Sequence, residues 1–124
     1  MKLKKREQET VNNLLRNYAD KSYRLNASIS LSASFEHDKK LCEVCLFLRH
    51  HARTPFYTEL RLKGGLRPDV FAPLHVKKFI EILHSESFFD WEKIKGAKYK
   101  RLGISKEDII FIRTDEKVTI NSMN

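Results

Sequence analysis

Two acidic residues interrupt apolar segments that otherwise have the composition of buried β-strands. Asp69 lies in "LRPDVF" (residues 66–71), and Glu81 lies in "KFIEIL" (residues 78–83). Aspartate is depleted from strands, and burying a carboxylate costs free energy unless the group is neutralised or holds a cation. The pattern therefore predicts that these two acids bind positive charge.

The spacing of the two segments predicts an antiparallel pair that brings the acids together. If residues 67–72 pair with residues 78–83 across the short connection between them, Asp69 lies directly opposite Glu81, with Cβ atoms ~4.5–5.5 Å apart. Two carboxylates this close repel, which raises one pKa or requires a cation between them. Oxygen ligands of this kind suit Mg²⁺ or Mn²⁺. The alternative, an exposed pair that is merely near in sequence, is disfavoured by the apolar residues on either side of each acid.

The charge of the chain indicates a polyanionic partner. The formal net charge is +8, and the basic residues are concentrated in residues 1–24 and 91–101. Clustered Lys and Arg gain affinity by displacing counterions from phosphates, so nucleic acid is the expected partner. The alternative is that these segments are only solvated helix faces. The candidate nucleic-acid-binding residues are Lys4, Lys5, Arg6, Lys93, Lys100 and Arg101.

The length of 124 residues predicts a single domain spanning 1–124. No apolar run approaches the ~20 residues that cross a bilayer, so no membrane partner is expected. The first ten residues, "MKLKKREQET", lack the apolar region of a secretory signal. A cytoplasmic protein is therefore expected.

Hydrophobic periodicity predicts a helix, several strands, a second helix and a final strand. In the first helix, Glu7 falls inside the apolar stripe, where it is either a functional acid or a first-turn acid beside the helix dipole. In the second helix, Phe88, Trp91, Ile94 and Leu102 are expected to face inward. The predicted ranges are a helix over 3–20, a β-hairpin over 23–50, a possible strand over 56–62, strands over 67–72 and 78–83, a helix over 86–102, a strand over 108–114 and a short strand or frayed end after that.

One C-x-x-C pair lies in the hairpin segment, in "LCEVCLFLRH" (residues 41–50). A zinc site needs converging ligands, and residues three apart on a strand point to opposite faces. Structural cysteines are therefore favoured. A zinc site built on Cys42, Cys45, His50 and His51 is the alternative.

The segment "RPDV", followed after a short gap by "FIEILHSES", resembles the motif of the PD-(D/E)XK nuclease superfamily, which includes restriction endonucleases and archaeal Holliday-junction resolvases. The resemblance implies an α+β (α/β) restriction-endonuclease-like core: a mixed β-sheet flanked by helices, in the order α-β-β-β-α-β. Pro68 and Asp69 match the PD motif, and Glu81 matches the first acid of the second motif. By the same resemblance, Glu7 is the candidate for the acid that the first helix contributes in these enzymes.

The position of the motif lysine holds Leu83, which cannot orient or deprotonate water. In the predicted register, Arg67 lies across from Leu83 and is the first candidate substitute, since its fixed charge can stabilise a phosphoryl transition state. Lys77, on the same strand face, and Lys63 are further candidates. This departure from the motif is the main support for a non-catalytic alternative.

The resemblance implies hydrolysis of phosphodiester bonds that depends on Mg²⁺ or Mn²⁺, with Asp69, Glu81 and Glu7 holding the metal and Arg67 assisting. No pattern for reading bases is present, so structure-selective or non-specific cutting is expected, with DNA favoured over RNA. A homodimer is expected, because one small protomer covers little duplex. The alternative function is a catalytically inactive nuclease-fold module that binds nucleic acid. Metal binding at Asp69 and Glu81 separates the two functions.

Overall fold

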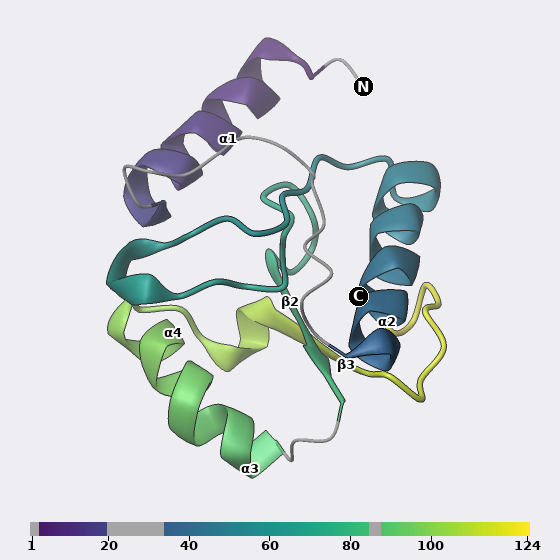
Figure 1. The fold of residues 1–124 in the computed structure, drawn as a ribbon. Helices are drawn as coiled ribbons and strands as arrows, with labels where there is room; N and C mark the ends of the chain where they lie inside the picture. The colour runs from purple at the N-terminus through teal and green to yellow at the C-terminus, as the bar shows by residue number, and fades with distance from the viewer. Residues whose placement is uncertain (1–2, 20–33, 85–87) are drawn as a thin grey trace.

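A computed structural model describes residues 3–19, 34–84 and 88–124, which form an α+β fold around a three-stranded mixed sheet (Figure 1). The strand order is β1-β2-β3, with β1 antiparallel to β2 and β2 parallel to β3. Helical segments precede the sheet and also connect β2 to β3. The strands are β1 (Val70–Phe71), β2 (Phe79–Leu83) and β3 (Ile109–Arg113).

The helical segments of the described chain comprise α-helices, π turns and 3₁₀ turns. The longest are α1 (Lys5–Tyr18) and α2 (Phe35–Leu46), and α2 continues into a π turn, η1 (Phe47–His51). Between β2 and β3 the segments α3, η3 and α4 follow one another without a break and are called here the 88–101 helix. Its parts are α3 (Phe88–Trp91), the π turn η3 (Glu92–Gly96) and α4 (Ala97–Arg101), and the 3₁₀ turns are η2 (Lys63–Gly65) and η4 (Lys106–Asp108).

Buried apolar residues form one core on each face of the sheet. Residues alternate along β2, so Phe79 and Leu83 belong to the core with α1 and the 88–101 helix, whereas Ile80 and Ile82 belong to the core with α2. All five residues of β2 are buried. A strand covered on both faces is expected to be apolar throughout, which makes Glu81 its one exceptional residue.

The predicted pairing of the two motif segments is confirmed. Val70 pairs with Ile80 and Phe71 with Phe79, which is the register that sets Asp69 opposite Glu81. The strand β1 is short because Pro68 has no N–H to donate to the ladder. The predicted helix over 3–20 is also confirmed as α1, and the predicted strand over 108–114 is confirmed as β3.

The predicted hairpin over 23–50 is wrong for residues 35–50, which are helical. Ser34 caps α2 by accepting a hydrogen bond from the backbone N–H of His37 at 3.2 Å, and two acids occupy the first turn. The buried residues Leu41, Val44 and Leu48 recur at helical spacing and pack against the sheet. The mostly apolar composition of residues 41–48 is compatible with a buried strand as well as with a buried helix. The capping serine at position 34 is the sequence signal that distinguishes the helix. Residues 23–33 of the predicted hairpin lie outside the described ranges.

Two other predicted strands differ from the structure. Over 56–62 the chain makes only isolated bridges, Tyr57 to Phe71 and Leu62 to Ala19. The segment after β3 consists of turns and irregular chain. It is tied back to α2 by the buried Lys40, whose ammonium contacts Glu43 at 2.6 Å and the carbonyl oxygen of Glu116 at 2.5 Å.

The predicted helix over 86–102 is confirmed for 88–101, and its predicted inward face is confirmed for Trp91 and Leu102 but not for Phe88 and Ile94. Trp91 is buried as expected, whereas the side chain of Ile94 is 71% exposed and that of Phe88 is 36% exposed. The π turn at Glu92–Gly96 adds a residue to the helical repeat and so changes which side chains face the sheet. Lys95, rather than Ile94, points inward.

Gly96 allows the π turn to pack against Trp91, which gives a stability prediction. A Cβ atom at this position would lie 3.1 Å from Cζ3 of the Trp91 ring and 3.3 Å from Cγ of Glu92. Gly→Ala in a helix usually stabilises by up to ~1 kcal/mol, but crowding a packed ring costs ~1–3 kcal/mol. We therefore expect Gly96→Ala to lower the free energy of unfolding by about 1 kcal/mol in urea titrations. Lys100→Ala, at an exposed position of α4, is the control and should change little; a Gly96→Ala protein more stable than wild type would contradict the prediction.

Candidate functional site

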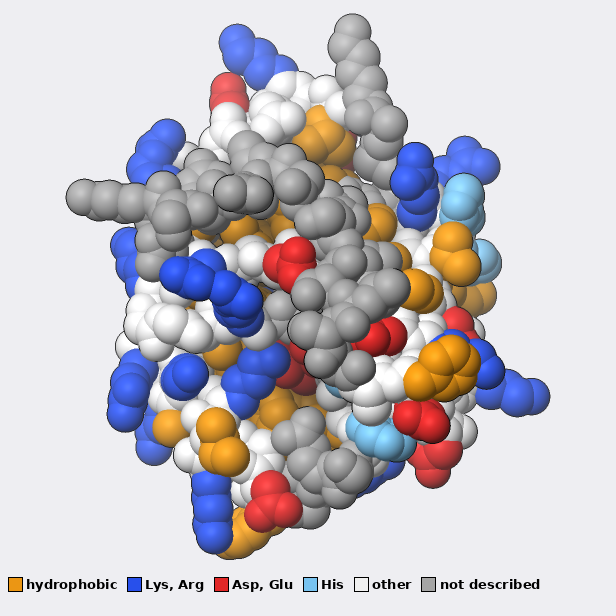
Figure 2. Space-filling view, in the orientation of Figure 1, with side chains coloured by type: hydrophobic (Ala, Val, Ile, Leu, Met, Phe, Trp, Pro, Cys, Tyr) orange, Lys and Arg blue, Asp and Glu red, His pale blue; other side chains and the backbone are white. Residues whose placement is uncertain are grey.

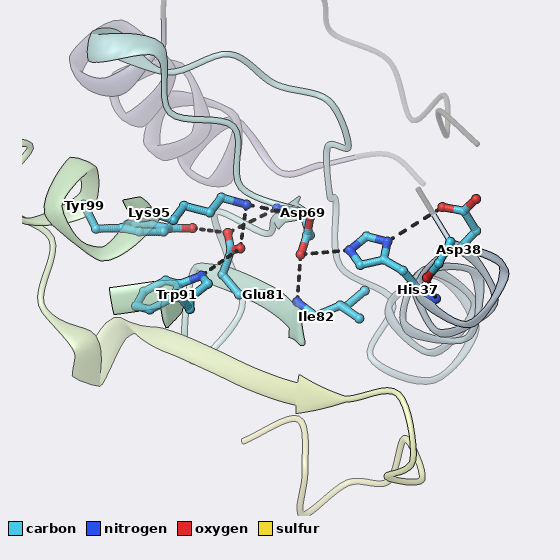
Figure 3. Close-up of polar contacts among 9 residues, drawn as sticks. His37, Asp38, Asp69, Glu81, Ile82, Trp91, Lys95 and Tyr99 are labelled. Carbon is cyan, nitrogen blue, oxygen red and sulfur yellow. Dashed lines mark hydrogen bonds and ion pairs between the residues drawn. The ribbon is translucent and has the colours of Figure 1, made fainter. Parts of the chain in front are cut away.

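The candidate site lies where β1 meets β2, on the side of the sheet that faces the 88–101 helix (Figure 3). Glu81 shares its strand face with Phe79 and Leu83, and its side chain is 1% exposed. Asp69, just before β1, is 18% exposed, and its backbone N–H donates to Oε2 of Glu81 at 3.3 Å. One acid is therefore buried and its partner reaches the surface.

Three side chains of the 88–101 helix converge on Glu81. Trp91 donates its indole N–H to Oε1 at 3.3 Å, the Lys95 ammonium lies 2.6 Å from the same oxygen, and the Tyr99 hydroxyl donates to Oε2 at 2.6 Å. These residues are spaced four apart and so share one helix face. A buried carboxylate requires such donors, and this helix supplies them.

Lys95 is the cation that the sequence analysis missed. Its ammonium lies 2.6 Å from Oε1 of Glu81 and 3.8 Å from Oδ1 of Asp69, so it contacts both acids, while its side chain remains 26% exposed. Arg67, which precedes β1, is instead exposed, and Lys63 is exposed in η2. The expectation that a cation accompanies the two acids is confirmed, but the predicted substitute was the wrong residue. The available signal was the i, i+4, i+8 series Trp91, Lys95, Tyr99.

Asp69 is held from its other side by α2. Its Oδ2 accepts a hydrogen bond from the backbone N–H of Ile82 at 2.7 Å and lies 3.4 Å from Nε2 of His37. Nδ1 of His37 is in turn 3.7 Å from Oδ1 of Asp38 (Figure 3). The fixed oxygen of Asp69 is therefore Oδ2, and Oδ1 is the oxygen directed toward Lys95.

The two carboxyl groups have pKa values shifted in opposite directions. Burial, and then the charge of Asp69, raises the pKa of Glu81 to about 7. Burial alone would raise the pKa of Asp69 too, but the hydrogen bond from His37 and the charge of Lys95 hold that pKa below its ordinary value. The hydrogen bond to Asp69 raises the pKa of His37, against the effect of its burial. Near neutral pH, Asp69 is thus ionised and Glu81 is the acid that exchanges a proton.

Glu7 is not brought to this site. It lies in the first turn of α1, where its Oε1 accepts a hydrogen bond from the backbone N–H of Lys4 at 3.1 Å. This is the first-turn role that the sequence left open. Across the described ranges, no three or more His, Cys, Asp or Glu side chains gather as a group of metal ligands.

The C-x-x-C pair lies on α2 rather than on a strand, so the predicted opposite orientation is wrong. Cys42 is half-buried and Cys45 is buried, and both are free thiols. Burial, and then the neighbouring Cys42, raises the pKa of Cys45 to about 12, which keeps it protonated. Cys45 packs in the core between α2 and the sheet, as a structural cysteine would.

The predicted nucleic-acid-binding residues lie on two separate helical segments. Lys and Arg side chains gather along the left side of the view in Figure 2, where Figure 1 places α4. Lys93 also lies over the exposed ring of Phe89, with its ammonium 4.3 Å from the ring centroid. All six candidates are exposed: Lys4, Lys5 and Arg6 at the start of α1, and Lys93, Lys100 and Arg101 on the 88–101 helix.

Comparison of the chain with protein-family models, curated protein sequences and solved structures gave no match. In the described part of the chain, no helix is both long enough and apolar enough to cross a membrane. Inferences about function therefore rest on the chemistry of the site itself.

Proposed function

We propose that this protein is a metal-dependent nuclease with a PD-(D/E)XK-like site formed by Asp69, Glu81 and Lys95. The observation that carries the proposal is the position of the Lys95 ammonium beside Oδ1 of Asp69 and Oε1 of Glu81. The motif needs two acids and one lysine in a single place, not a lysine at one sequence position. Position 83 holds leucine in place of the motif lysine, and the helix after β2 supplies a lysine, Lys95, at the same two acids.

The two carboxylates meet the requirements of Mg²⁺ or Mn²⁺. These ions commonly take one or two protein carboxylates and complete their shell with water and substrate phosphate. Oε2 of Glu81 and Oδ2 of Asp69 are held by the backbone and by Tyr99, whereas Oε1 and Oδ1 are the oxygens that face Lys95. Oε1 also accepts the Trp91 indole N–H, so a metal held by Oε1 and Oδ1 would take the place of the Lys95 ammonium there. The same two oxygens face the Lys95 ammonium, which supports a site for positive charge at this position.

Each residue of the site then has a defined role. Asp69 and Glu81 would hold the metal, which supplies polarisation of the scissile phosphate and lowers the pKa of the attacking water. Tyr99 and Trp91 fix the Glu81 carboxylate, and Ile82 N–H and His37 fix Asp69. The Lys95 side chain is 26% exposed, so its ammonium can turn to hold the phosphate or orient water while the carboxylates bind metal.

The proposed substrate is DNA, cut without base-specific recognition. The exposed basic residues of α1 and of the 88–101 helix supply phosphate contacts, which position a backbone but carry no sequence information. The connection of β2 to β3 through the 88–101 helix supports the proposed restriction-endonuclease-like core, because it places Lys95 against Glu81. We propose a homodimer, since two strands are addressed most simply by two copies of one site.

Cleavage of labelled single-stranded, duplex and four-way-junction DNA tests the proposal. We expect wild-type protein to cut at least one of these with Mg²⁺ or Mn²⁺ and not with EDTA. Asp69→Asn should lose this cutting, because an amide binds the metal far more weakly than a carboxylate. Asp115→Asn, at an exposed turn, is the matched control and should cut as wild type does.

A binding module without catalysis is the second candidate function, and one observation favours it. Glu81 already has four protein donors around its two oxygens, as a purely structural carboxylate would. The second function predicts that the protein binds DNA without metal, cuts it under no condition, and binds it equally well as Asp69→Asn. These three results together would establish a binding module in place of the nuclease.

A further inference from the structure

A cavity of about 750 Å³ lies apart from the two acids, beside the π turn that ends α2. The π turn is closed by Ala52 N–H, which donates to Phe47 O at 3.0 Å, and Thr54 N–H donates to Leu48 O at 3.1 Å. These bonds direct the 53–57 segment back along the edge of β1, where Tyr57 pairs with Phe71. The volume is within the ~300–1,000 Å³ range of small-molecule sites.

The cavity lies toward the opposite end of β1 from the candidate active site. Tyr57 pairs antiparallel with Phe71, so residues before 57 run toward the loop after β1, whereas Asp69 precedes the strand. A neighbouring cavity shares Arg53 and Thr54 and is lined also by His75, which lies in that loop. The cavity is therefore a separate feature and not an extension of the metal site.

The polar side of the cavity is positively charged. Arg49 and His50 come from the π turn and Arg53 from the segment that follows, and all three are exposed. Among the described residues that line this cavity there is no carboxylate. Glu7, which lines the neighbouring cavity, is engaged by the backbone N–H of Lys4. Two guanidinium groups and an imidazole around one hollow favour a phosphate-sized anion.

The wall of the cavity contains a buried polar group without a partner in the described residues. Thr54 lines the cavity, and its Oγ1 is buried without a hydrogen bond in the described part of the chain. A buried hydroxyl without a partner costs free energy, and a strained segment is one place where such a cost is retained. Arg53 also adopts a left-handed backbone conformation, with φ of 49°, which side-chain-bearing residues reach at a cost.

The remaining lining is apolar and aromatic. Phe56 and Tyr57 are half-buried and line the cavity together with Pro55. The ring of Tyr57 is stacked against Phe71, with centroids 6.3 Å apart, so it is held in place from behind. Fixed aromatic rings beside a cationic rim suit a ligand with a flat ring and a phosphate.

We propose that this cavity binds a phosphorylated nucleoside, with the phosphate held by Arg49 and Arg53 and the base against Phe56 and Tyr57. The same chemistry is presented by a free mononucleotide and by the phosphorylated end of a nucleic-acid strand. Binding at this cavity is independent of metal and of the proposed cleavage.

Calorimetric titration in EDTA, with no divalent metal, tests the proposal. The ligands are AMP, adenosine, inorganic phosphate, octyl phosphate, and a short single strand with or without a 5′-phosphate. We expect AMP to bind at least about tenfold more tightly than adenosine or inorganic phosphate. A 5′-phosphate preference in the oligonucleotide pair would assign the natural source to strand ends, and AMP binding without that preference would assign it to free nucleotides.

Variants assign the binding to the cavity. Arg49→Gln and Arg53→Asn should each weaken AMP binding about tenfold, since both side chains are exposed and asparagine tolerates the left-handed backbone at position 53. Arg113→Gln, exposed at the end of β3, is the control and should leave the affinity unchanged. The proposal is overturned if AMP does not bind at millimolar concentration, if octyl phosphate binds as well as AMP, or if both cavity variants bind AMP as wild type does. Because no metal or cutting is involved, these outcomes are independent of the fate of the nuclease proposal.

Discussion

Lys95→Met is expected to reduce metal-dependent DNA cleavage by at least ~100-fold while leaving DNA binding nearly unchanged. Methionine keeps most of the length and apolar stem of lysine but removes the charge that contacts both acids. Removing one group that stabilises developing charge at a phosphoryl or acyl centre costs ~10²–10³ in rate. The measurement is single-turnover cleavage at saturating Mg²⁺, so that weaker metal binding does not enter the rate.

The control for Lys95→Met is Lys93→Met, in the same π turn but exposed and directed to the Phe89 ring. That variant removes the same charge from the chain and should affect DNA affinity more than the cleavage step. Equal single-turnover rates for Lys95→Met and wild type would show that Lys95 is only a structural counter-ion of Glu81. The nuclease proposal would then need another cation at the two acids.

Pairing of the two acids was predictable from the sequence because the connection between β1 and β2 is short. A fixed loop length sets the register, and a one-residue slip would have moved Asp69 and Glu81 to different faces of the sheet. The apolar residues around both acids independently required a buried pair. Local pattern and strand geometry thus pointed to the same arrangement, which the observed pairing of Val70 with Ile80 confirms.

The cation at the site was harder to predict because the π turn changes the helical phase. A regular helix drawn through Phe88 and Trp91 directs Ile94 inward, and the sequence analysis chose this apolar residue without considering Lys95. The structure has Ile94 exposed and Lys95 on Glu81, because the longer repeat of the π turn directs Ile94 away from the sheet while position 95 stays on the Trp91 face. Within residues 88–101, the sequence feature that accompanies this π turn is Gly96, which packs against the Trp91 ring.

The helical nature of residues 35–48 was missed because apolar composition does not separate a buried helix from a buried strand. The helical conformation of this segment matters for the site, because α2 places His37 beside Oδ2 of Asp69. As a strand, the same segment would have directed alternate residues to opposite faces, and the pairing of His37 with Asp69 would have had no basis in the sequence.

Metal-free protein is expected to lose stability relative to Glu81→Gln as the pH rises from about 4.5 to about 8. The pKa of Glu81 is raised to about 7 in the folded protein, so the folded state binds this proton more tightly than the unfolded state. The stability that the proton confers is complete below the ordinary pKa of a glutamate and is lost as the pH passes through 7. At ~1.4 kcal/mol per pKa unit the relative loss is on the order of 2–3 kcal/mol.

Urea unfolding of both proteins in EDTA at pH 5 and pH 8 measures this difference. His37 also loses stabilising charge in this range, but it is present in both proteins and contacts Asp69 rather than Glu81, so its effect largely cancels. The lowered pKa of Asp69 acts at lower pH, because its stabilisation is lost only as the pH falls below the ordinary aspartate value. Glu107→Gln, at an exposed position, should show no such dependence relative to wild type.

The same titration separates a metal site from a structural carboxylate. If Asp69 and Glu81 hold Mg²⁺, the ion binds the ionised pair and should restore stability to wild type at pH 8, with a gain that grows with the logarithm of its concentration. Glu81→Gln should gain much less, because an amide oxygen is a weaker ligand than a carboxylate. A pH-dependent loss that Mg²⁺ does not reverse would mean that Glu81 serves only to anchor Trp91, Lys95 and Tyr99 to β2. In that case the acids would stabilise a binding module rather than catalyse cleavage.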